Sequence, residues 1–191
     1  MGQYHDAVVE MDNEKGYERY NTDKSMPQRD GWIGQKLMEH SWIGNEFVES
    51  VAMLLYHSPR RVMWMGDYTE PSDFERIRKN HIGVVLPSMN SEYGYSDILD
   101  VEPITMEHKF LVNHDKKLYI DMDKYIEKNS DDGWAIHPLP LLTSVSNGRG
   151  GGDYCGINED SVGAWEWDKL SVEDDVDKSQ YNELNVSFKE E

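Results

Sequence analysis

One segment of the chain has residue types suited to binding an anion. Residues 147–153 are Asn-Gly-Arg-Gly-Gly-Gly-Asp. Glycines let backbone N–H groups converge on an anion, and a guanidinium adds a forked contact to phosphate or carboxylate. The spacing matches neither a Walker loop nor a dinucleotide fingerprint. We predict a site for a small nucleotide-like anion, or alternatively a hairpin tip in which the glycines satisfy turn geometry; the residues concerned are Asn147, Gly148, Arg149, Gly150, Gly151, Gly152 and Asp153.

The other reactive residue types form no recognised catalytic pattern. The seven histidines never show the i, i+4 spacing of a zinc-binding helix. Cys155 is the single cysteine and would need a nearby histidine, such as His137, to act as a nucleophile. No serine lies in a Gly-x-Ser-x-Gly elbow. We therefore predict no catalytic residue, no cofactor and no metal site, while a metal site assembled from distant histidines and carboxylates stays open.

Acidic residues are concentrated in three short groups in the second half of the chain. None of the groups has the twelve-residue calcium-binding pattern. The net charge of −18 opposes binding to nucleic acid or to an anionic membrane and attracts basic partners. The alternative is a solvated acidic surface without a partner. We predict contacts to a basic protein surface through Asp121, Asp123, Asp131, Asp132, Glu173, Asp174 and Asp175.

The composition is compatible with a folded, acidic chain. With 191 residues, of which 38% are hydrophobic, the chain suits one compact domain. Six Trp and eleven Tyr add large side chains to the core. No run approaches the roughly 20 apolar residues of a membrane span, and the first residues lack the layout of a secretion signal. We expect a cytoplasmic protein with no membrane contact.

Hydrophobic spacing predicts the main helices and strands. Apolar residues at helical spacing over residues 42–55, capped by Ser41 or Asn45, predict the principal helix. A capping box that starts at Ser72 predicts a short helix over residues 72–79. We also expect one or two helical turns over 123–128, a mobile acidic segment over 171–179, and strands over 61–65, 82–86, 162–168 and 183–189.

The two halves share an ordered set of short patterns, which predicts an internal duplication. The matched segments are 7–17 with 110–119, 30–33 with 132–135, and 62–67 with 162–168. Chance recurrence of turn patterns is the alternative. We predict an α+β fold of two similar strand-rich halves, residues 1–100 and 101–191. The first would hold the main helix, and the second would hold the glycine loop and a C-terminal strand.

Several segments together resemble a loose group of small proteins. They are Met-Gly-Gln-Tyr at residues 1–4, residues 36–41, 64–68 and 113–119, and Gly-Arg-Gly-Gly-Gly-Asp-Tyr at 148–154. The chain resembles uncharacterised acidic proteins from bacteria and their phages. That resemblance spans most of the chain but carries no assigned reaction. It implies a short, acidic protein of the cytoplasm, which is the host cytoplasm if the protein is phage-encoded.

Charge and resemblance together favour a non-enzymatic binding protein. We predict a phage-type inhibitor that occupies the basic, nucleic-acid-binding surface of a host or defence protein and does not bind nucleic acid itself. An immunity protein against a basic toxin would show the same pattern. The alternative is a binder, or an enzyme, for a small anionic nucleotide-like ligand held by the loop at residues 147–153. The oligomeric state stays open.

Overall fold

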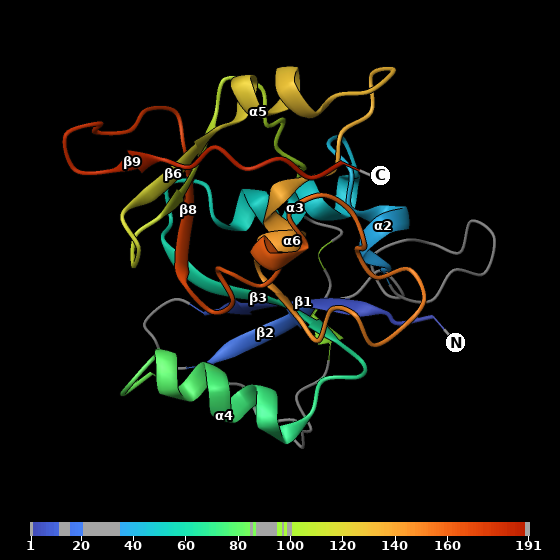
Figure 1. Cartoon of the computed structure of the whole chain (residues 1–191). Coiled ribbons are helices and arrows are strands. Elements are labelled where there is room, and N and C mark those ends of the chain that lie inside the picture. Colours follow the sequence, from blue (N-terminus) through green and yellow to red (C-terminus); the bar gives the residue numbers. More distant parts are fainter. Residues whose placement is uncertain are drawn as a thin grey trace.

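The computed structural model contains one mixed sheet with helices packed around it, which confirms the α+β class (Figure 1). The structure describes residues 2–11, 16–20, 35–84, 86, 95–96, 98 and 101–189. The strands are β1 (His5–Glu10), β2 (Tyr17–Tyr20), β3 (Arg60–Gly66), β4 (Tyr95–Ser96), β5 (Phe110–Asn113), β6 (Leu118–Asp121), β7 (Ser144–Val145), β8 (Lys169–Glu173) and β9 (Asn182–Glu183). The helices are α2 (Leu37–His40), α3 (Glu46–Leu54), α4 (Pro71–Asn80), α5 (Met122–Asn129) and α6 (Pro138–Leu142), with a 3-10 turn η1 at Glu159–Ser161.

The sheet has the order β4-β2-β1-β3-β8-β5-β6-β9, with β7 beside β3. In the first half, the antiparallel β1–β2 hairpin is followed by helices and then by β3, which pairs antiparallel with β1. In the second half, the β5–β6 hairpin is followed by helices and then by β8, which pairs antiparallel with β5. A common origin of the halves stays a prediction, and Trp32 of one matched pair lies outside the described residues.

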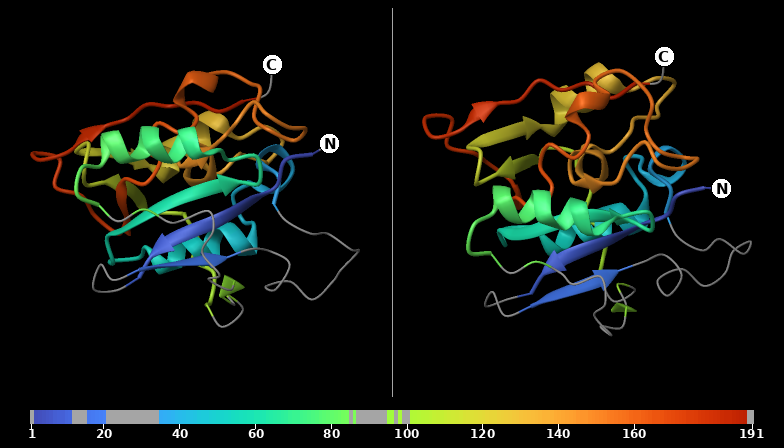
Figure 2. Two further views of the ribbon diagram at one scale, coloured as in Figure 1. Left: turned by 90° about the horizontal axis from the view of Figure 1, so that it is seen from below. Right: turned by 60° about the horizontal axis from the view of Figure 1, so that its bottom comes forward.

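Side chains of β3 alternate between two hydrophobic clusters, as the period of a strand requires. Val62 and Trp64 belong to the larger cluster, together with residues of α3 and α6. Met63 and Met65 belong to the smaller cluster, together with residues of α4. Figures 1 and 2 show α4 on one face of the sheet and the other long helices on the opposite face. β3 is therefore the strand that both layers share.

Local capping fixes where the two main helices begin. The Asn45 side chain accepts a hydrogen bond from the Val48 N–H, which confirms the predicted cap of α3. The cap of α4 is Glu70 and not Ser72, because Glu70 and Asp73 exchange bonds between side chain and backbone across the first turn. Pro71 then occupies the first helical position, where its missing N–H costs nothing. In the described part of the chain, no helix has the length and apolar character needed to cross a membrane.

Four predicted segments differ from the structure. Residues 162–168 form turns and not a strand, because Gly163 and Trp167 have φ angles of 77° and 59°. The segment predicted to be mobile contributes its first residues to β8. Of the predicted strand over residues 183–189, only Glu183 belongs to a strand, β9 (Asn182–Glu183), which pairs with β6. Val186 and Phe188 are buried in the core but form no strand pairing. Residues 82–84 form a turn region and not the predicted strand.

Two histidines are fully buried in the interior. His5 lies on β1 and His137 precedes α6, and both side chains are completely shielded from solvent. The Nδ1 atom of His137 accepts a hydrogen bond from the Leu139 N–H, while its Nε2 atom and the Nδ1 atom of His5 have no partner among the described residues. Burial lowers the pKa of each ring to about 3. Both rings are therefore neutral in the fold at neutral pH.

This burial predicts a loss of stability in mild acid. Below pH 6.5 the unfolded chain protonates these histidines, whereas the folded chain keeps them neutral until the pH approaches their lowered pKa. Each ring therefore reduces the free energy of unfolding by up to about 1.4 kcal/mol per pH unit, or about 4 kcal/mol for both at pH 5. Urea unfolding at pH 7 and pH 5 measures the effect.

His137→Asn is the matched variant. It keeps an acceptor for the Leu139 N–H but has no titrating ring, so its acid-induced loss should be about half that of the wild type. An unchanged loss would mean that other groups cause the acid sensitivity.

Candidate functional site

Arg149, the cation of the glycine loop, is engaged within the protein. Its Nη1 and Nη2 atoms bond the two carboxylate oxygens of Asp73 on α4 at 2.7 and 2.9 Å, and Nη1 also donates to the Tyr68 carbonyl at 2.9 Å. The Asp73 side chain is only 5% exposed. Burial alone would raise the pKa of Asp73, but bonds from Arg149 and from the Glu70 N–H hold it below its usual value. The pair therefore fastens the loop to α4.

The backbone of the loop surrounds a carboxylate of its own chain. The N–H groups of Arg149 and Gly150 donate to the same Asp153 oxygen at 2.8 and 2.9 Å. The loop also anchors the N-terminal segment, because Gln3 donates its N–H to the Gly151 carbonyl. A Cβ on Gly150 would lie 2.5 Å from the Cβ of Gln3, so close backbone approach requires glycine there.

The predicted anion site is therefore not preformed for an external ligand. An incoming phosphate would have to displace Asp73 from Arg149 and Asp153 from the loop N–H groups. Asn147 is also engaged, since its side chain exchanges two hydrogen bonds with the backbone of Tyr154. Gly148 and Gly152 have φ angles of 86° and 84°, which favour glycine on conformational grounds. Ligand binding by this loop stays a prediction.

Four of the seven predicted partner-binding carboxylates come together around one residue of the sheet. Phe110 pairs with Asp121 of β6 on one side and with Glu173 of β8 on the other. Asp123 and Asp174 follow these two residues closely in the chain. Asp175 comes next after Asp174 and is exposed. Asp131 and Asp132 lie beyond the C-terminal end of α5, in a tight turn, and are also exposed.

The clustered carboxylates are paired with nearby cationic and histidine side chains. Lys109 Nζ lies 2.9 Å from Asp174, and Tyr56 donates its hydroxyl to the same carboxylate at 2.6 Å. The Tyr56 bond, together with Lys109, lowers the pKa of Asp174 to about 2. On the other side of Phe110, Lys124 bonds Glu183 at 2.8 Å and Asp121 at 3.5 Å.

Two exposed histidines belong to the same cluster. His57 Nδ1 lies 2.7 Å from Glu173, and His108 Nδ1 lies 2.8 Å from Asp123. The bonds to these carboxylates raise the pKa of both imidazoles. The two rings therefore gain their positive charge at a higher pH than an ordinary histidine does.

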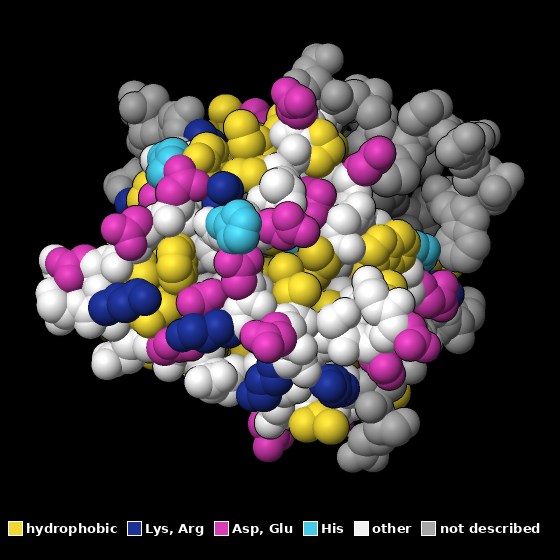
Figure 3. Space-filling view, turned by 90° about the horizontal axis from the view of Figure 1, so that it is seen from above, with side chains coloured by type: hydrophobic (Ala, Val, Ile, Leu, Met, Phe, Trp, Pro, Cys, Tyr) yellow, Lys and Arg dark blue, Asp and Glu magenta, His cyan; other side chains and the backbone are white. Residues whose placement is uncertain are grey.

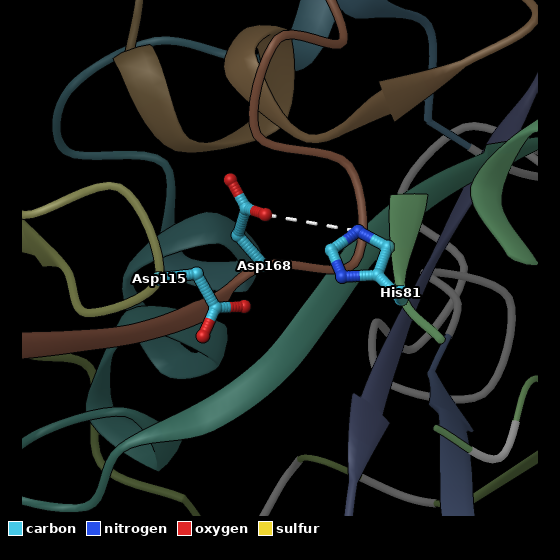
Figure 4. Close-up of side chains that lie close together, drawn as sticks. All are labelled: His81, Asp115 and Asp168. Atoms are coloured by element: carbon cyan, nitrogen blue, oxygen red, sulfur yellow. Dashed lines mark ion pairs between the residues drawn. The ribbon is translucent and has the colours of Figure 1, made fainter. Parts of the chain in front are cut away.

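The structure also contains a polar cleft that the sequence patterns did not identify. Its volume is about 680 Å³, and it lies between the C-terminal end of α4, the β5–β6 turn and the turns before β8. His81, Asp115 and Asp168 each offer a ligand atom within 4.8 Å of the others (Figure 4). Arg61, Arg76 and Lys116 line the same cleft. These residues are far apart in the sequence, so no local motif signals the cluster.

Glu166 is the most unusual acid of the cleft. Its side chain is only 6% exposed, and one carboxylate oxygen forms an ion pair with Arg76. The other oxygen, Oε2, is buried and has no hydrogen-bond partner among the described residues. Burial raises the pKa of Glu166 above its usual value. A buried acceptor without a partner is costly to the fold.

The Arg149–Asp73 pair gives a test of the role of the glycine loop. Arg149→Ala removes two charge-assisted bonds and leaves the buried Asp73 carboxylate with Arg76 and one backbone N–H, so it should destabilise the fold by about 1–2 kcal/mol. Urea unfolding measures the change. The control is Arg78→Ala, which removes an exposed arginine of α4, the helix that carries Asp73. It should shift the free energy of unfolding by no more than about 0.5 kcal/mol. Equal effects of the two variants would contradict a structural role for Arg149.

Comparison with known proteins gives no guide to the activity. No protein-family model, no curated protein and no solved structure matches this chain. The resemblance to acidic proteins of bacteria and phages stays a prediction, and the function has to be argued from the chain's own residues.

Proposed function

We propose that the protein binds a basic protein surface through an acidic face centred on Phe110. The observation that carries the proposal is the convergence of Asp121 and Glu173 on either side of Phe110, with Asp123 and Asp174 beside them. Among the described residues, the acidic face has seven carboxylates and three lysines: Glu107, Asp121, Asp123, Glu173, Asp174, Asp175 and Glu183, with Lys109, Lys124 and Lys178.

Existing ion pairs on this face do not prevent a partner from binding. The Asp123, Asp174 and Lys124 side chains are each about half exposed, at 49%, 51% and 57%. Exposed ion pairs of this kind contribute about 0–1 kcal/mol, so an arginine or lysine of a partner can replace the internal cation at little cost. Figure 3 views the molecule from above and shows acidic side chains interspersed with basic side chains (lysine or arginine) and histidine side chains.

The net charge of −18 supports the same proposal at longer range. Opposite fields speed diffusional encounter, and a cleft of one sign focuses the field. A groove that normally holds nucleic acid has the required positive field. A protein that covered such a groove would act as an inhibitor by excluding the nucleic acid. The partner class that we propose is therefore a basic nucleic-acid-handling protein of the host or of a defence system.

Neutralising the acidic face should weaken this binding. We expect the quadruple variant Asp121→Asn, Asp123→Asn, Glu173→Gln and Asp174→Asn to slow association with a captured basic partner at least tenfold at low salt. Surface plasmon resonance at 0.05 and 0.3 M salt measures the rates. Loss of nucleic-acid binding by the purified partner, when the wild-type protein is added, tests the inhibitor role.

The matched control removes four carboxylates elsewhere. Glu46→Gln, Glu75→Gln, Glu159→Gln and Asp160→Asn change the net charge by the same amount at other exposed positions. Equal slowing by both quadruple variants would remove the acidic face as the binding surface and leave only the global charge.

The paired histidines predict that binding weakens in mild acid. Because carboxylates raise the pKa of His57 and His108, both rings become positively charged at a higher pH than an ordinary histidine does. The acidic face then loses part of its negative charge, and association with a basic partner should slow. The double variant His57→Gln and His108→Gln should show a flatter pH profile. An identical profile in the variant would show that these histidines do not control binding.

A further inference from the structure

We propose that His81, Asp115 and Asp168 bind one divalent transition-metal cation in the cleft between α4 and the β5–β6 turn. The three residues come from separate parts of the chain, and one ligand atom of each lies within 4.8 Å of the others. Figure 4 shows the imidazole and the two carboxylates facing a common space. This site is separate from the acidic face and goes beyond the proposed binding function.

Each carboxylate has one oxygen held by the protein and one left over. Asp168 Oδ2 accepts a bond from Asn113 at 2.7 Å and pairs with Lys116, while Oδ1 lies 3.7 Å from His81 Nε2. Asp115 Oδ2 accepts bonds from Arg61 at 2.8 Å and from the Lys169 N–H at 3.2 Å. Among the described residues, the hydrogen bonds of the Asp115 carboxylate go to Oδ2. Such outer contacts orient metal-binding carboxylates in the way that metal sites require.

The three ligand atoms would need to move only a short distance to surround a cation. In a tetrahedral site with bonds of about 2.1 Å, ligand atoms lie about 3.4 Å apart. The 3.7 Å between His81 Nε2 and Asp168 Oδ1 is close to this value. His81 Nε2 now lies 3.0 Å from the Glu166 carbonyl, so binding would place the imidazole proton on Nδ1 and turn the Nε2 lone pair to the cation. His81 is the C-cap of α4, where a small rotation does not disturb a helical turn.

A second observation is a further buried carboxylate in the wall of this cleft. Glu166 lines the same cleft, its side chain is 6% exposed, and its Oε2 atom has no partner among the described residues. This atom is independent of the three proposed ligands. Lys116 and Arg61 pair with the Oδ2 atoms of Asp168 and Asp115, on the side of each carboxylate away from the proposed ligand oxygen Oδ1.

The ligand set indicates which cations suit the site. One imidazole nitrogen and two carboxylate oxygens fit manganese or zinc better than calcium or magnesium, which prefer oxygen ligands alone. Three protein ligands leave coordination positions open toward the cleft, as in sites where a metal carries water or a substrate.

Manganese titration of the full chain tests the proposal. In 0.15 M salt with excess magnesium to suppress unspecific binding by the acidic surface, the electron paramagnetic resonance signal of free Mn²⁺ should fall until one ion is bound per chain. His81→Gln and Asp115→Asn should each weaken this binding at least tenfold. Both positions lie at the mouth of the cleft and avoid the buried Asp168, so these variants should fold, which circular dichroism checks.

The matched controls are His108→Gln and Asp123→Asn, which disrupt an exposed histidine–carboxylate pair on the acidic face. They should leave the affinity unchanged. The proposal is overturned if the wild type binds no saturating Mn²⁺ or Zn²⁺. It is also overturned if the control variants weaken binding as much as His81→Gln and Asp115→Asn do.

Discussion

Arginine–carboxylate pairs tie α4 to the second half of the chain, and much of the remaining architecture depends on them. Arg149 of the glycine loop bonds the buried Asp73 of α4, and Arg76 of α4 pairs with the buried Glu166 that precedes β8. Without these pairs, buried carboxylates would lack compensation, which costs several kcal/mol. Because α4 covers the sheet face opposite the other long helices, the same pairs fix one side of the polar cleft.

The shortage of cations explains where negative charge accumulates. The chain has 19 lysines and arginines for 37 aspartates and glutamates. Several of its arginines serve buried or half-buried carboxylates, as Arg61 does for Asp115 and Arg149 for Asp73. The carboxylates of the acidic face around Phe110 pair with lysines and histidines instead. These ion pairs are more exposed, and the histidine pairs depend on pH. Stability therefore shapes the surface that we propose for partner binding.

Local sequence signals predicted the elements that depend on local physics. The α+β class, the helix capped by Asn45 and the strand around Trp64 follow from periodicity and capping. The strand predicted over residues 162–168 was wrong because Gly163 and Trp167 adopt positive φ, and their N–H groups donate to the Leu141 and Val62 carbonyls, which are distant in the sequence. Arg149 was predicted as part of an anion site, and its pairing with Asp73 could not be predicted from residues that lie 76 positions apart. The cluster of His81, Asp115 and Asp168 could not be predicted from the sequence either, since only the folded chain brings its members together.

The cleft lies beside a short junction in the sheet. β3 and β8 join the two halves through only two residue pairs, Arg60 with Leu170 and Arg61 with Lys169. Asp168, the residue before β8, is not part of the strand pairing. The turns at residues 163–167 that precede it line the cleft beside this junction. Arg61 closes part of this space by bonding both Asp115 and the Trp167 carbonyl. A cation held by His81, Asp115 and Asp168 would connect α4, the β5–β6 turn and the start of β8 beside this short pairing, so its binding would stabilise the folded junction to an extent set by the cation concentration relative to its Kd.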